Sequence, residues 1–142
     1  MTEKKQDQKA LESKYLEHQA LSQQLKQLEN QLQTVDGQIL EIKTIDEGID
    51  NIKKTKTGEE TLIPISSGIF MKCNILDTKK FLINVGNGVV VEKSADETRD
   101  LLNKQLDELE KIKKQMSDQF QQIILQLTEI EKQMNELISE QG

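Results

Sequence analysis

The side chains best suited to catalysis or metal binding are few and isolated in this sequence. His18 is the only histidine and Cys73 the only cysteine, and they lie in different regions. A metal site needs several converging ligands, and a cysteine nucleophile needs a nearby base. His18 falls on a heptad seam, where a polar residue tunes the register, and Cys73 shares a strand face with Met71 and Ile75. We therefore expect no catalytic, cofactor-binding or metal-binding residues.

Two segments contain the residue types found in nucleotide-binding loops, but neither has the sequence order that such a loop requires. The segment Gly86–Gly88 lacks the third glycine of a dinucleotide loop, and a run of valines follows it instead of a helix. A tight hairpin turn is therefore expected there. The segment Lys54–Gly58 has phosphate-loop residue types in the wrong order and is interpreted as a polar helix end. The sequence thus disfavours an enzyme or a nucleotide-driven machine.

Composition excludes further classes of protein. The 142 residues carry a net charge of −6, which disfavours nucleic acid and anionic membranes as partners. Only 35% of the residues are hydrophobic, below the roughly 45–50% of globular proteins, so an elongated helical architecture is expected. The polar start predicts no signal peptide, and no apolar run is long enough to span a membrane. The single cysteine favours a reducing, cytoplasmic location.

Heptad periodicity predicts two long helices of similar length, which would pair antiparallel with both chain ends at one tip. The first seam contains His18, Leu21, Leu25, Leu28, Leu32, Val35, Ile39 and Ile42. The second contains Leu102, Leu106, Leu109, Met116, Phe120, Ile123, Leu127, Ile130, Met134 and Leu137. Lys113 interrupts the second seam, and Gly37 and Gly48 weaken the first helix. A capping box at Ser94–Glu97, with a hydrogen bond in each direction, would start the second helix.

The middle of the chain predicts two β-hairpins whose strands are apolar on both faces. The strand-like runs are 61–65, 69–75, 81–85 and 89–92, with turn residues between them. A sheet of this size can be covered on only one face by its own chain. We therefore expect another subunit to cover the second apolar face. The expected interface residues are Leu62, Ile63, Ile65, Ile69, Phe70, Met71, Ile75, Phe81, Leu82, Ile83, Val85, Val89, Val90 and Val91.

The order of these elements and two local motifs resemble the prefoldin family, in particular the α-type subunits of archaea. The segment Gly58–Pro64 resembles the family's entry into its first strand, and Asn84–Lys93 resembles its last hairpin. The resemblance covers nearly the whole chain, and two hairpins rather than one are the α-type pattern. It implies an α+β fold, a long antiparallel two-helix coiled coil with two central hairpins that join an oligomeric β-barrel platform. The chain would then be one subunit, 1–142, with helices at 5–57 and 94–141 around hairpins at 58–93.

The resemblance also implies a function. Two α and four β prefoldin subunits would form a hexamer that holds unfolded client proteins without ATP and passes them to a group II chaperonin. The expected client-binding residues lie near the paired chain ends: Leu11, Tyr15, Leu16, Met134, Leu137 and Ile138. An adaptable apolar surface there would suit varied clients. The alternative is a structural coiled-coil adaptor that binds a defined folded partner.

Overall fold

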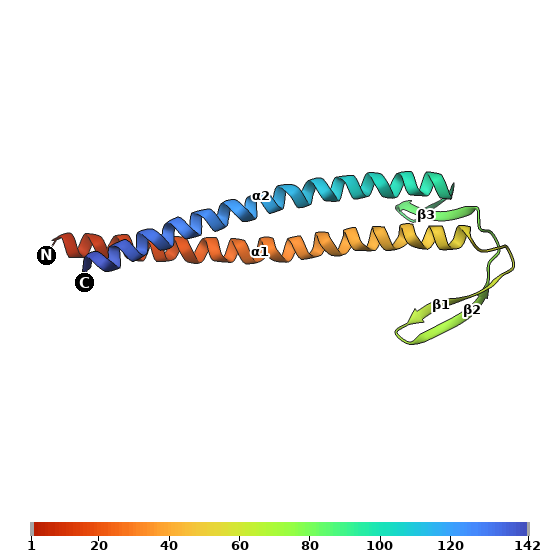
Figure 1. Ribbon diagram of the computed structural model, residues 1–142, viewed down its shortest axis with the longest axis horizontal. Coiled ribbons are helices and arrows are strands. Elements are labelled where there is room, and N and C mark those ends of the chain that lie inside the picture. Colours follow the sequence, from red (N-terminus) through yellow and green to blue (C-terminus); the bar gives the residue numbers. More distant parts are fainter. Residues whose placement is uncertain (1, 142) are drawn as a thin grey trace. The chain divides into compact units, whose positions relative to one another are not determined.

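The computed structural model describes residues 2–141. Along the chain, one long helix is followed by two β-hairpins and then by a second long helix (Figure 1). The elements are α1 (Thr2–Lys53), β1 (Glu60–Ser66), β2 (Ile69–Asn74), β3 (Lys80–Gly86), β4 (Val89–Ser94) and α2 (Ala95–Gln141). The predicted α+β fold of two long helices around two central hairpins is therefore confirmed, and the oligomeric β-barrel platform stays a prediction. Neither Gly37 nor Gly48 ends α1, although each weakens a helix interior.

The chain divides into two compact units. The first joins residues 1–37 to residues 109–142, and the second comprises residues 38–108. In the first unit, the beginning of α1 lies beside the end of α2, as the heptad pattern predicts (Figure 1). Its buried seam residues are Leu28, Val35, Leu127 and Ile130.

Two polar pairs fix the antiparallel register within the first unit. His18 Nε2 lies 3.0 Å from Glu131 Oε1, and Lys113 Nζ lies 2.7 Å from Asp36 Oδ1. The two α1 residues are as many positions apart as their two α2 partners, so the register does not slip between the pairs. Lys113 thus occupies its seam position as half of an ion pair, while its neighbour Ile112 stays exposed.

The second unit contains the end of α1, both hairpins and the beginning of α2. Its buried apolar side chains on the helices are Ile39, Ile42, Ile49, Ala95 and Leu102. The hairpins form two separate two-stranded antiparallel sheets, β1 with β2 and β3 with β4. Each ladder shifts register beside its turn, between Pro64 and Ser66 in the first and between Asn84 and Gly86 in the second.

The turn at residues 86–88 is a hairpin turn, as predicted. Asn87 has φ of 53° and Gly88 has φ of 74°, and two successive positive φ values suit the twist of a tight hairpin. The Asn84 side chain accepts a hydrogen bond from the Gly86 N–H at 2.9 Å. The segment is therefore built to reverse the chain.

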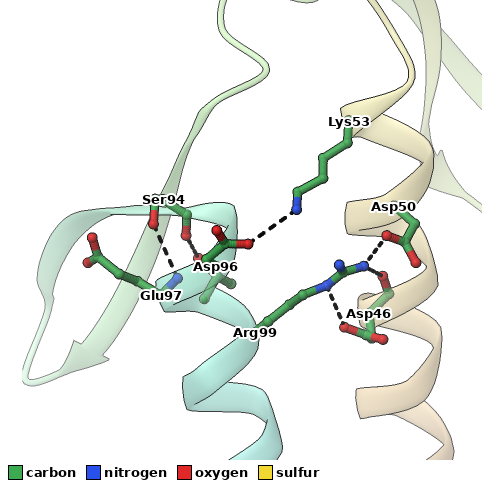
Figure 2. Close-up of polar contacts among 8 residues, drawn as sticks. Asp46, Asp50, Lys53, Ser94, Asp96, Glu97 and Arg99 are labelled. Atoms are coloured by element: carbon green, nitrogen blue, oxygen red, sulfur yellow. Dashed lines mark hydrogen bonds and ion pairs between the residues drawn. The ribbon is translucent and has the colours of Figure 1, made fainter.

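The start of α2 confirms one half of the predicted capping box. The Ser94 hydroxyl accepts a hydrogen bond from the Glu97 N–H at 3.2 Å (Figure 2). The Thr98 hydroxyl donates to the Ser94 carbonyl at 2.7 Å. The return bond from the Ser94 N–H to Glu97 is not formed among the hydrogen bonds of residues 2–141. Ser94 is also the last residue of β4 and pairs with Lys80 of β3. Its main chain is therefore part of the strand ladder, whereas the predicted capping box assumed a free helix end.

Candidate functional site

An apolar pocket lies at the open end of the first unit, which we call the tip pocket. It has a volume of about 660 Å³ and is lined by Leu11, Glu12, Tyr15, Leu16, Met134 and Ile138. Five of the six residues predicted to contact clients therefore line one pocket. The sixth, Leu137, is half-buried and does not line it.

The pocket is open because several of its apolar side chains lie off the heptad seam. Leu16 is 64% exposed, and Tyr15 and Ile138 are each 54% exposed. Leu11 and Met134 are half-buried, since they also face the paired helix. Glu12 is the one charged lining residue and was not predicted. Its position four residues before Leu16, on the same helix face, is the signal that could have indicated it.

His18 joins the two helices near the tip pocket through Glu131, across the seam. The His18 side chain is half-buried, and Glu131 is exposed. A polar contact of this kind favours one alignment of the helices, which agrees with the expected register role of His18. Glu131 was not predicted as its partner, because the partner depends on the antiparallel register.

The hairpins expose most of the predicted interface residues. Four of the predicted set are half-buried: Ile75, Phe81, Ile83 and Val91. The other ten are exposed: Leu62, Ile63, Ile65, Ile69, Phe70, Met71, Leu82, Val85, Val89 and Val90. Leu76 was not predicted but is 89% exposed. It follows Ile75 directly before a turn, and that apolar pair was the available signal.

Arg99, the only arginine, ties α2 to α1 in the second unit (Figure 2). Its Nε donates to Asp46 Oδ1 at 3.0 Å, and its Nη2 donates to Asp50. The hydrogen bond from Arg99 lowers the pKa of Asp50 below its ordinary 3.8, and the same bond raises the pKa of Arg99. Lys53 Nζ also lies 3.3 Å from Asp96 Oδ1. These pairs hold the helices together beside the hairpins.

In residues 2–141, no group of three or more His, Cys, Asp or Glu side chains is placed to hold a metal ion. Within the same range, neither helix has a stretch long and apolar enough to cross a membrane.

Comparisons with known proteins agree with this architecture. A model of the Prefoldin subunit family matches residues 21–140. Prefoldin subunit alpha of Thermofilum pendens is 30% identical over 81% of this chain and 89% of its own. Prefoldin subunit alpha of Pyrococcus horikoshii is 30% identical over 96% of this chain and 93% of its own. Prefoldin subunit alpha 1 of Methanocaldococcus jannaschii is 34% identical over 73% of this chain and 75% of its own.

A solved structure supports the fold independently. A chain of the filamentous prefoldin from Methanocaldococcus jannaschii, solved by cryo-electron microscopy, superposes with a TM-score of 0.65. The match covers 86% of this chain and 95% of that one, at 16% sequence identity. The family match and the relatives, together with this fold, show a coiled-coil chaperone subunit. The chain belongs to the prefoldin family.

Proposed function

We propose that this chain is the α-type subunit of a holdase that captures unfolded polypeptides without ATP. Capture takes place at the tip pocket, and the captured chain is delivered to a group II chaperonin. The subunit works by binding alone, as a non-enzymatic protein with no cofactor, in the cytoplasm. The observation that carries the proposal is the open apolar pocket formed by Tyr15, Leu16 and Ile138 at the end of the helix pair.

The chemistry of the tip pocket suits unfolded chains as a class. Its walls are aliphatic, aromatic and thioether groups, and unbranched methionine adapts its shape to different partners. Unfolded proteins expose apolar segments that folded proteins bury. A pocket of this type discriminates by exposure of apolar surface and requires no client sequence motif.

The exposed hairpins support assembly with other subunits. Ten predicted interface residues remain uncovered in the single chain, and large uncovered apolar patches mark interaction surfaces. We take the partners to be prefoldin β subunits in a hexamer of two α and four β chains. Several tips around one client then act together, because each further contact is intramolecular and raises the overall avidity.

A nucleotide-free aggregation assay tests the proposal. Chemically unfolded citrate synthase is diluted into buffer with the assembled particle of this chain and its β partner. We expect suppressed light scattering from the intact particle. A particle whose α chain lacks residues 1–16 and 134–142 should assemble normally, as judged by its size, yet suppress aggregation less than the intact particle, because only the tips of the β chains remain.

Two outcomes would contradict the proposal. Full suppression by the truncated particle would exclude the tip pocket as the client site. No suppression by the intact particle would favour the structural adaptor, which binds one folded partner and does not protect unfolded chains.

A further inference from the structure

A polar groove follows one side of the helix pair in the first unit, and we call it the glutamine groove. It consists of two adjoining cavities of about 440 Å³ and about 350 Å³, which share Gln24 and Gln126 as lining residues. The smaller cavity has the apolar side chains of Leu28 and Ile123 at its base. Its other lining residues are all glutamines: Gln24, Gln27, Gln31, Gln119, Gln122 and Gln126.

The heptad repeat explains why the glutamines face one groove. The positions that flank the seam on this side recur every seven residues, at Glu17, Gln24, Gln31, Gln119, Gln126 and Gln133. Flanking positions of a coiled coil commonly carry opposite charges that pair between the helices. Glu131 and Asp36, which pair across the seam, occupy flanking positions on the opposite side. One side of the helix pair thus presents mainly neutral amides, whereas the other forms ion pairs.

The chemistry and length of the glutamine groove suit an extended peptide backbone. A glutamine side chain has two N–H donors and an acceptor oxygen, so it can pair with both polar groups of a peptide unit. Folded proteins already pair nearly all of their buried backbone groups, whereas an unfolded chain leaves them available. From Glu17 to Gln31, α1 rises about 21 Å, which is the length of about six residues of extended chain.

Gln133 contains an acceptor that the chain leaves unpaired. Its Nε2 donates to Glu129 Oε1 at 3.4 Å, about one turn earlier in α2. Its Oε1 is buried, and within residues 2–141 it has no hydrogen-bond partner. A buried acceptor without a partner is destabilising, so a hydrogen bond from an incoming N–H group would be favourable. Gln133 lines the groove, and turning its amide into the groove would bring this oxygen to such a donor.

We propose that the glutamine groove binds an extended backbone segment of an unfolded client whose apolar side chains occupy the tip pocket. The two sites adjoin: Lys14 and Gln133 line the groove, and the next residues, Tyr15 and Met134, line the pocket. The inference rests on the proposed function, which supplies the client. It adds a second contact, which recognises main-chain amides and therefore requires no client sequence, because every peptide has the same backbone.

Photocross-linking from the groove tests whether client backbone lies there. The photoreactive amino acid p-benzoylphenylalanine replaces Gln31, which lines the groove, or Gln33, an exposed residue of the same helix that does not. The assembled particle is irradiated with a biotinylated peptide of six apolar residues followed by eight glycines. A second peptide has sarcosine, which lacks an N–H, in place of every glycine.

The local readout reports on the α chain even though the particle has other arms. With the glycine peptide, position 31 should give at least about fivefold more adducts than position 33. With the sarcosine peptide, adducts from position 31 should fall by about fivefold or more, because the backbone donors are gone.

A triple variant tests the amides themselves. Gln24→Ala, Gln126→Ala and Gln133→Ala together remove three amides of the groove. The matched control removes three exposed amides outside the groove, by changing to alanine Gln23, Gln33 and Gln121. Both variants should keep their helices, since alanine is the best helix former. Adducts of the glycine peptide from position 31 should fall by about fivefold or more in the groove variant and stay unchanged in the control.

The proposal is overturned if positions 31 and 33 give equal adducts, or if sarcosine leaves the adducts from position 31 unchanged. Adducts to another chain of the particle instead of the peptide would also overturn it, by assigning the groove to that chain. Cross-linking from position 16 tests the proposed function separately. Adducts from position 16 without adducts from position 31 contradict the groove proposal alone, whereas their absence from position 16 contradicts capture at the tip pocket.

Discussion

Replacing two exposed tip residues should weaken client binding without weakening the fold. The double variant Leu16→Ser and Ile138→Ser removes apolar side chains that are 64% and 54% exposed in the free chain. Full burial of a Leu or Ile side chain contributes about 1.5–3 kcal/mol of free energy. The part that is still exposed in the free chain could therefore contribute about 1–2 kcal/mol per side chain to the free energy of client binding. If a client covers about half of that surface, the two together contribute about 1–2 kcal/mol.

This free energy corresponds to about a 5- to 30-fold weaker Kd for each tip. The matched control is the double variant Leu40→Ser and Leu125→Ser, whose leucines are 65% and 68% exposed but do not line the tip pocket. Both variants make one Leu or Ile to Ser change in each helix, so they lose similar helix propensity. Their thermal denaturation midpoints should therefore be similar.

The assay is fluorescence anisotropy of a labelled, permanently unfolded client, reduced and carboxymethylated α-lactalbumin, titrated with the assembled particle. The tip variant should bind more weakly than the wild type, and the control should bind as the wild type does. Equal binding by all three particles, or equal loss in both variants, would refute the argument from exposed tip surface.

Three further predictions concern stability of the chain. Ser94→Ala should lower the free energy of unfolding by about 1 kcal/mol, because the Glu97 N–H loses its capping acceptor, and chemical denaturation measures this. Leu127→Ala should cost about 2–4 kcal/mol, because this side chain is buried in the seam; a loss no larger than that of Leu125→Ala would contradict the assigned packing. Arg99→Met should destabilise the chain at neutral pH. The lowered pKa of Asp50 means that this stabilisation is present above about pH 4 and is lost as the pH falls through the lowered value, so a difference from wild type that persists at about pH 2 would count against it.

Periodicity was sufficient to predict the elements of this fold. Steps of three and four residues indicate paired helices, and short two-faced apolar runs with turn residues between them indicate hairpins. These signals depend on neighbours in sequence. The turn at Asn87 and Gly88 was predictable for the same reason, since a two-residue turn is a local structure.

Contacts between distant residues were harder to predict. The partner of His18 is Glu131, and those of Arg99 are Asp46 and Asp50; each pairing depends on the antiparallel register. A seam pattern constrains that register only to within a turn or so, because neighbouring heptads resemble one another.

The tip pocket and an apolar groove at Gly48 in the second unit differ in how far sequence could predict them. Five of six expected tip residues line the pocket, because the chain ends of an antiparallel helix pair must meet. Gly48 could be recognised only as a weak point of the helix. Its place beside Phe81 and Leu102 follows from how β3 lies over the helices, which no local pattern specifies.

Site-specific photocross-linking tests the central claim most directly. The photoreactive amino acid p-benzoylphenylalanine is placed at position 16, 138, 40 or 125 of the α chain, and the assembled particle is irradiated with an unfolded client. The account predicts client adducts from positions 16 and 138 and few from positions 40 and 125. Equal adducts from all four positions, or adducts mainly from 40 and 125, would show that clients are not held in the tip pocket.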